Sequence, residues 1–241
     1  MVKGTQQVVA LGVGVLLVTG GLLRAQSRSV DELILDLKDS RQEKQIDVLR
    51  ALAKRGAGAE KAVHPIIPLL KDSDPPVRKE AAHTLGAIGG GARGAAGALS
   101  EALNDRAADV RFEAAKSLRL IGSDSSTTAS ALAGALRDSE GRVRYQAAKG
   151  LQAMGGNARP AVSQLADALK DSEPDVRYQA AAALGAIGPD AKGALPALEA
   201  AKNDSDADVK DMAEQAFAKI AGKPAPPSRG HGRRSRWDEG N

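Results

Sequence analysis

Apolar positions return along most of this 241-residue chain with a fixed period of 33 residues. The frame is clearest at Val77–Gly89 and returns at Val110–Gly122, Val143–Gly155 and Val176–Gly188, with more divergent copies at Val209–Ala221 and Lys44–Gly56. A single copy is too short to bury its own apolar face, so neighbouring copies must stack to build a core. The pattern therefore predicts a solenoid of about six units over residues 29–221.

Within each unit the apolar spacing predicts a first helix. One register carries Leu or Ile in all six units, at Leu33, Ile66, Leu99, Leu132, Leu165 and Leu198. A second leucine register follows four residues later, on the same helix face, at Leu37, Leu70, Leu103, Leu136 and Leu169, with Lys202 as the exception. An aspartate then recurs at Asp39, Asp72, Asp105, Asp138, Asp171 and Asp204. It predicts a tight turn, because its carboxylate can accept from free backbone N–H groups.

The second helix of each unit begins near Val77 and its equivalents. At 100° per residue, Val77, Ala81 and Leu85 fall within one apolar arc. The small position of this arc recurs as Ala81, Ala114, Ala147, Ala180 and Ala213, and the large one as Leu52, Leu85, Leu118, Leu151, Leu184 and Phe217. A glycine follows the last turn at Gly56, Gly89, Gly122, Gly155 and Gly188, as a helix end with positive φ requires. Aromatic residues make up only 2% of the chain, so we expect a thin interior in which small residues let helices approach closely.

A basic residue stands at the edge of the apolar arc in five units, at Arg78, Arg111, Arg144, Arg177 and Lys210. We expect each of these residues to pair with a turn aspartate of its own or the neighbouring unit. Such pairs would form a ladder that fixes the stacking angle, so we interpret the basic residues as structural.

The resulting frame, D-S-x-x-x-V-R-x-x-A-A-x-x-L-G-x-I-G, resembles the HEAT repeat in the short form of phycobilisome-lyase-type proteins. The resemblance covers residues 29–221. It implies an all-α fold, a right-handed α-solenoid of helix pairs whose second helices line the concave side. The 33-residue period also suits ankyrin repeats, but the chain lacks their T-P-L-H element, and it lacks the tetratricopeptide W-x-x-L-G-x-x-Y.

Residues 1–28 predict a targeting segment. Lys3 precedes an apolar run from Val8 to Leu23, and Arg24 stands just beyond it. Sixteen helical residues reach roughly 24 Å, short of a hydrocarbon core of about 30 Å. The length and the basic start favour a cleaved signal peptide, while a membrane anchor through residues 8–23 is the alternative, because bilayers thin around short spans. Either interpretation predicts a protein that is exported to the periplasm or the extracellular space, or held at the membrane.

Charge is concentrated at the two ends of the chain. Of the net +4, residues 1–26 carry +2 and residues 222–241 carry +3, which leaves −1 for residues 27–221. A repeat body without net positive charge argues against nucleic acid as a partner. Residues 222–241 are rich in Pro, Gly, Ser and Arg and contain one isolated tryptophan, a composition typical of a disordered basic tail. The chain has no cysteine, so disulfides and thiolate metal sites are excluded.

The sequence shows no catalytic constellation. Deoxyhypusine hydroxylase, a HEAT-like enzyme, holds two irons through His-Glu pairs, but His64, His83 and His231 are each followed by another residue type. The aspartates within residues 204–208 lack the glycine and the bidentate glutamate of a calcium loop. We therefore predict no catalytic residue, no metal and no cofactor, and a protein that is not an enzyme. Phycobilin lyases have no short signature to test, so an enzyme or chromophore-lyase subunit of that type is the alternative.

One strip of the second helices has the composition of a binding surface. Three of the four Phe and Tyr residues of the chain share a register opposite the apolar arc, at Phe112, Tyr145 and Tyr178, and the basic residues Lys116, Lys149 and Arg119 follow them. Aromatic rings edged by cations are typical of interaction hot spots. We predict that this strip binds an acidic or extended segment of another protein, which makes the chain a non-catalytic interaction scaffold. The alternative is that the rings only shield thin, Ala-rich helices.

Overall fold

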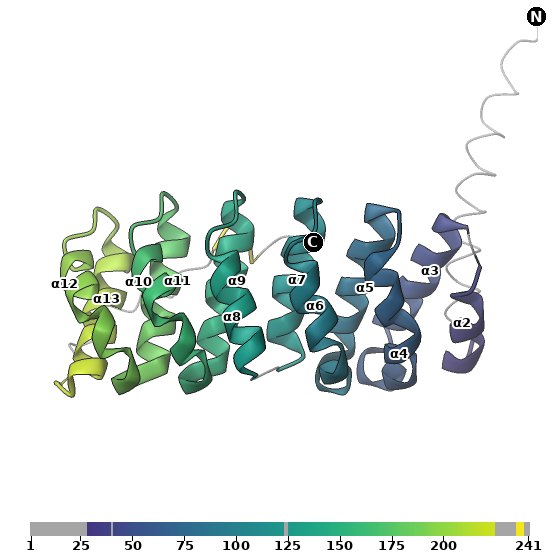
Figure 1. Cartoon of the computed structure of the whole chain (residues 1–241), viewed down its shortest axis with the longest axis horizontal. Helices are drawn as coiled ribbons and strands as arrows, with labels where there is room; N and C mark the ends of the chain where they lie inside the picture. Colours follow the sequence, from purple (N-terminus) through teal and green to yellow (C-terminus); the bar gives the residue numbers. More distant parts are fainter. Residues whose placement is uncertain (1–27, 40, 123–124, 225–234, 239–241) are drawn as a thin grey trace, which may run out of the picture.

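The computed structural model describes residues 28–39, 41–122, 125–224 and 235–238, and these residues form helices and turns without any strand. Figure 1 shows the helices standing side by side in pairs along one axis, which confirms the predicted all-α solenoid. The first helices of the six pairs are α2 (Val30–Asp36), α4 (Val63–Ile66), α6 (Ala96–Ala102), α8 (Ser126–Ala135), α10 (Val162–Ala168) and α12 (Leu195–Ala201). The second helices are α3 (Gln42–Ala53), α5 (Pro75–Ile88), α7 (Ala108–Leu120), α9 (Gly141–Met154), α11 (Pro174–Ile187) and α13 (Ala207–Ala221).

Short 3-10 segments lead into most first helices, at Gly56–Ala62, Gly89–Ala95, Gly155–Ala161 and Gly188–Ala194, and a further one, Ile67–Lys71, continues α4. The predicted targeting segment, residues 1–28, lies outside the described residues apart from Arg28. Among the helices that the structure describes, none has the length and apolarity to cross a bilayer.

The core follows the sequence pattern. The first leucine register is at most 1% exposed in every unit, and the alanine register of the second helices is fully buried. Small residues do bring neighbouring second helices together: a Cβ built on Gly86 of α5 would lie 2.3 Å from the Ser117 hydroxyl of α7. A thin, close-packed interior of this kind tolerates little change in side-chain volume.

Glycine ends the second helices for a stricter reason than the expected left-handed cap. Gly89, at the end of α5, has φ 72° and ψ −139°, and Gly188 repeats this conformation with φ 75° and ψ −143°. This is the mirror image of extended backbone, which residues with a Cβ essentially never adopt. The repeated glycine therefore fixes the direction in which the chain leaves each second helix.

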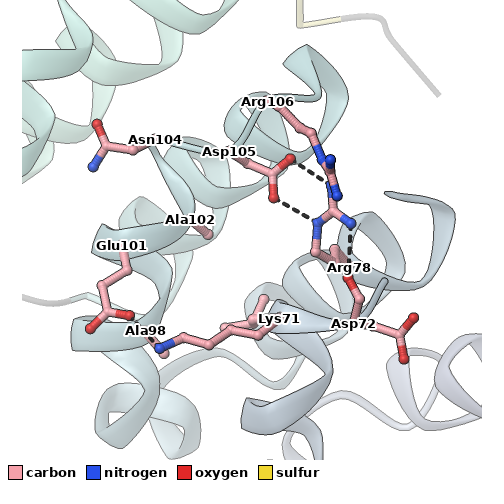
Figure 2. Close-up of a pocket in the computed structure, with 10 residues that line it drawn as sticks. Lys71, Asp72, Arg78, Ala98, Glu101, Ala102, Asn104, Asp105 and Arg106 are labelled. Atoms are coloured by element: carbon pink, nitrogen blue, oxygen red, sulfur yellow. Dashed lines mark hydrogen bonds and ion pairs between the residues drawn. The ribbon is translucent and has the colours of Figure 1, made fainter. Parts of the chain in front are cut away.

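A ladder of ion pairs connects successive units, as the register of basic residues predicted. Figure 2 shows Arg78 of α5 gripping Asp105, the turn aspartate of the next unit, through bonds of 2.7 and 2.9 Å, while its Nη1 donates to the Asp72 carbonyl oxygen of its own turn. The same arrangement recurs at Arg111–Asp138, Arg144–Asp171 and Arg177–Asp204. Each guanidinium thus joins two turns, so the ladder sets the spacing of the units.

The ladder also changes the titration of its carboxylates. Burial, the largest single influence, would raise the pKa of Asp105, Asp138 and Asp204. The bidentate arginine bonds, the backbone N–H bond of the turn and the charge of the arginine together outweigh it and hold each pKa below its ordinary value. The hollow of about 460 Å³ in Figure 2 is walled by Arg78, Asp105 and the Lys71–Glu101 pair. Four of its charged groups are already paired, Arg78 with Asp105 and Lys71 with Glu101, so we interpret it as part of the ladder rather than as a ligand site.

Candidate functional site

The second helices form one continuous row, because α3, α5, α7, α9, α11 and α13 each pack against the next. We call the surface of this row the second-helix face; it is the side that the resemblance predicted to be concave. All six residues of the predicted strip belong to it, on α7, α9 and α11.

The predicted exposure of the aromatic strip is wrong. Phe112 and Tyr178 are half-buried, and Tyr145 is only 4% exposed. Neighbouring second helices stand close enough that this register lies in the grooves between them, and in the case of Tyr145 a further side chain covers the ring. A change of all three rings to Ala would therefore also remove packing, contrary to the expectation that these positions face only solvent.

Phe112 lies between two cations. Lys116 Nζ is 5.9 Å from the centroid of its ring, and Arg142 Cζ of α9 is 5.4 Å from it, within the range of cation–π attraction. Arg142 in turn donates to Asp109 over 2.7 Å, and Lys116 lies 3.7 Å from Glu113. The half-buried Phe112 ring lines a hollow of about 640 Å³ on the second-helix face, together with Asp109, Glu113 and Arg142. Lys116 lies beside the Phe112 ring but does not line the hollow.

A titratable pair lines the same hollow. His83 of α5 lies 3.4 Å from the Glu113 carboxylate of α7. The hydrogen bond that the His83 ring donates to the Glu113 carboxylate raises the pKa of His83. Burial opposes ionisation of Glu113, but the bond with His83 and the charge of Lys116 hold the pKa of Glu113 below its ordinary value. The two opposite shifts favour the charged forms of both groups, so the hollow contains an ion pair.

Arg119 lies near the C-terminal end of α7, three residues after Lys116. Its Nε is shielded from solvent and has no hydrogen-bond partner among the described residues. The predicted strip is thus not one cluster: Phe112, with Lys116 beside its ring, stands at the hollow, and Tyr145 and Lys149 form a second group on α9. Arg119 is separate from both.

The group on α9 is occupied by the chain's own C-terminal segment. The structure places residues 235–238 against α9 and α11, and Figure 1 shows this short yellow stretch beside α9. The Trp237 ring packs on the Tyr145 ring with centroids 5.4 Å apart and planes tilted by 48°. This geometry is one of the favourable ones for aromatic pairs.

Asp238 completes the contact with α9. Its carboxylate accepts a hydrogen bond of 2.9 Å from the Tyr145 hydroxyl and forms an ion pair with Lys149. Burial would raise the pKa of Asp238, but the bonds from Lys149 and Tyr145 lower it below its ordinary value. Burial, together with the bond to Asp238, raises the pKa of Tyr145. Both pKa shifts favour the same state, in which the protonated Tyr145 hydroxyl and the Lys149 ammonium bind the ionised Asp238 carboxylate.

The two residues before the tryptophan bind α11. Ser235 is 2% exposed and donates a hydrogen bond of 3.0 Å to Asp175, and Arg236 pairs with Glu173. Arg236 also lies 4.5 Å from the centroid of the Trp237 ring. All four residues of the segment therefore contact the second-helix face through their side chains.

The seat of the tryptophan depends on a missing side chain. A Cβ built on Gly141, the first residue of α9, would lie 3.2 Å from two atoms of the Trp237 ring. The equivalent positions of the other second helices carry Pro75, Ala108, Pro174 and Ala207. Glycine at this one unit leaves room for the large ring.

The sequence analysis missed this contact. Residues 222–241 have the composition of a disordered tail, and that prediction does not describe residues 235–238, which pack on the repeats. The only sequence signal was the single tryptophan of an aromatic-poor chain. A large aromatic residue is unusual in a tail that does not pack against a folded domain. Nothing in the local sequence says that its ring meets a tyrosine 92 residues earlier.

Within the described residues, no group of three or more His, Asp or Glu side chains could hold a metal ion. The polar groups that do gather, on α9 and α11 and around the hollow, are donors and acceptors suited to a peptide.

Comparisons with known proteins agree with this architecture. A model of HEAT repeats matches residues 30–119 and 128–218. A search of curated proteins found no match.

Solved structures of similar fold include an engineered protein, which is 26% identical with a TM-score of 0.65, the match covering 81% of this chain and 97% of that one. A designed armadillo repeat protein in complex with the peptide (KR)4 is 21% identical with a TM-score of 0.67, over 80% of this chain and 100% of that one. The complex of CpcE and CpcF of phycocyanin lyase, from a Nostoc species, is 22% identical with a TM-score of 0.58, over 80% of this chain and 77% of that one. At these identities the last two likenesses show the fold alone.

Proposed function

Because the chain belongs to the family of HEAT-repeat proteins, we propose that it is a non-catalytic scaffold that binds another protein through its second-helix face. The observation that carries the proposal is that this face already holds a peptide, residues 235–238, through the side chain of every residue. A surface that can satisfy a serine, an arginine, a tryptophan and an aspartate at once has the donors, acceptors and apolar seat that peptide recognition needs.

The adjoining hollow extends the same surface. Phe112 supplies an apolar anchor, and Arg142 and Lys116 supply positive charge beside it. Aromatic and arginine side chains at the centre of an interface carry most of its binding energy, whereas charges at the rim mainly set the association rate. The face therefore suits an extended segment that crosses α7, α9 and α11. A designed repeat protein of the same fold in complex with a peptide supports this use of the fold.

The remaining parts of the proposal concern place and chemistry. We propose that residues 1–28 direct export or anchor the protein at a membrane, so that the scaffold works outside the cytoplasm. The alternative function, an enzyme or chromophore-lyase subunit, has only the shared fold of the phycocyanin lyase complex in its favour. A bound chromophore or metal in the protein purified from its native cells would favour that alternative.

A site-specific crosslink tests the scaffold directly. A photoreactive amino acid replaces Phe112 in the full-length chain, and a control chain carries it at Ser163, an exposed position on the first helix α10. In native extract, the Phe112 position should capture a defined protein that unlabelled wild-type chain competes away, and the Ser163 position should not. Equal or absent capture at both positions would contradict binding through this face.

A further inference from the structure

Residues 235–238 occupy the part of the second-helix face where a partner would bind, and this points to control of the site by the chain itself. We propose that the face over α9 and α11 recognises a short segment in which tryptophan is followed by a carboxylate residue, and that residues 235–238 hold this site until a partner of the same chemistry displaces them. The inference rests on the proposed function, which it deepens by naming the segment that is recognised.

The contacts show which features of the segment are read. The Tyr145 ring contacts the indole of the tryptophan in a tilted arrangement. Its hydroxyl donates to the carboxylate of the residue that follows. Lys149 adds a charge to the same carboxylate, and its Nζ lies 5.4 Å from the centroid of the Tyr145 ring, so the phenol and the ammonium stand side by side. Gly141 opens the seat below the indole.

The segment itself is shaped for this seat. The Trp237 amide donates to the Ser235 hydroxyl over 3.2 Å, and the Asp238 amide donates to the Ser235 carbonyl oxygen over 3.0 Å. These bonds close a tight turn that brings the serine, the indole and the carboxylate to one side. Pre-shaping of this kind lowers the entropy lost on binding.

The connecting chain is long enough for the segment to be the chain's own. Ten residues separate Pro224 from Ser235, so the ends can be up to about 36 Å apart. The distance from α13 to α9 is two spacings between neighbouring second helices, or roughly 20 Å at the usual helix-packing distance. A tether of ten residues gives the segment an effective concentration in the millimolar range.

The tether also explains how the site can be selective. A free segment that makes only the same four contacts must reach about the effective concentration of the tether to displace it. A partner that also fills the hollow beside Phe112 gains contacts that the tail lacks. Arg236 and Trp237 form one wall of that hollow, so a segment entering it starts next to the residues that it must replace.

The single tryptophan of the chain reports tail docking without a partner. In the full-length protein, Trp237 fluorescence should be shielded from acrylamide relative to a free peptide of residues 233–240. Lys149→Glu, which sets a like charge against Asp238, should raise the quenching constant toward that of the peptide. The same charge reversal at Lys192, an exposed residue of the 3-10 segment Gly188–Ala194 outside the second-helix face, should leave quenching unchanged. Wild-type quenching equal to that of the free peptide would overturn the proposal, as would a Lys149→Glu chain that quenches like wild type.

Two further readouts separate the proposal from its rivals. Docking within one chain should be independent of protein concentration, so a loss of shielding on dilution would instead assign the segment to a second copy. Trp237→Ala together with Asp238→Ala should increase partner capture by the crosslinker at Phe112, because the competing tail is removed. Unchanged or reduced capture would show that the tail does not compete. Absence of capture in both chains, with Trp237 shielded, would count against the proposed function and leave tail docking standing.

Discussion

The ladder of ion pairs offers a perturbation with an internal control. Asp138 accepts two bonds from Arg111 of the preceding unit, at 2.6 and 2.8 Å, and one of 2.9 Å from the Glu140 amide in its own turn. Asp72 accepts the same turn bond, 2.9 Å from the Asp74 amide, but the preceding unit carries Gln45 at the ladder position. Replacing either aspartate by Ala removes the turn bond. Only Asp138→Ala also removes the carboxylate partner of a buried arginine, Arg111.

The expected difference follows from burial. The Arg111 and Asp138 side chains are 14% and 7% exposed, so the guanidinium in Asp138→Ala stays largely desolvated without its counter-charge. Breaking a buried pair by removing one partner costs about 3–5 kcal/mol. The turn bond alone is worth about 0.5–1.5 kcal/mol, which is the loss expected for Asp72→Ala. We therefore predict that Asp138→Ala lowers the free energy of unfolding by roughly 2–4 kcal/mol more than Asp72→Ala does.

Urea denaturation followed by circular dichroism measures both losses, with the slope of the transition as a check that the same structure unfolds. Adding Arg111→Met to Asp138→Ala should recover part of the loss, because it removes the abandoned charge. Equal losses for the two aspartates, or a double variant that is less stable than Asp138→Ala, would refute the view that the ladder holds the units together.

The remaining predictions concern the core, the hollow and the N-terminus. Leu118→Ala, at a position only 1% exposed in the middle of the stack, should cost about 2–5 kcal/mol in urea denaturation, and Leu52→Ala should cost less because its unit lies near the end; equal costs would argue against a stack of repeats. The raised pKa of His83 means that its ion pair with Glu113 stabilises the fold below pH 6.5 and is lost as the pH rises through the folded pKa of His83. The melting temperature should therefore show a component that falls as the pH rises above about 6.5 and is missing in His83→Gln; the same pH profile for both chains would show that the pair contributes nothing. A reporter fused after Ser29 should appear outside the cytoplasm, and intact-mass analysis of the native protein would distinguish cleavage from anchoring; a full-length, soluble, cytoplasmic product would contradict both.

Most of the fold could be predicted because it repeats. A 33-residue period exposes the leucine, alanine and glycine registers together, and each register has a single physical explanation at the helical period. The ladder was predictable for the same reason, since arginine and aspartate recur at constant spacing and stacking brings neighbouring units into contact.

The candidate site could be predicted only in part, because it depends on contacts that do not repeat. The aromatic register identified Tyr145 and Lys149 correctly as neighbours on α9. Their exposure could not be predicted, because it depends on Trp237, a residue of a tail whose composition indicates disorder. The role of Gly141 could not be predicted either, because a glycine at the start of a helix does not by itself indicate that an indole ring packs against it.

The central claim, that the second-helix face binds a tryptophan–carboxylate segment, can be measured with one titration. The full-length Trp237→Ala chain contains no tryptophan, so a peptide of residues 233–240 added to it carries the only indole in the sample. The account predicts saturable binding, seen as a change in the indole emission, that Lys149→Glu weakens at least ~10-fold and Lys192→Glu leaves unchanged. Emission that never saturates, or binding that is indifferent to Lys149→Glu, would contradict the account.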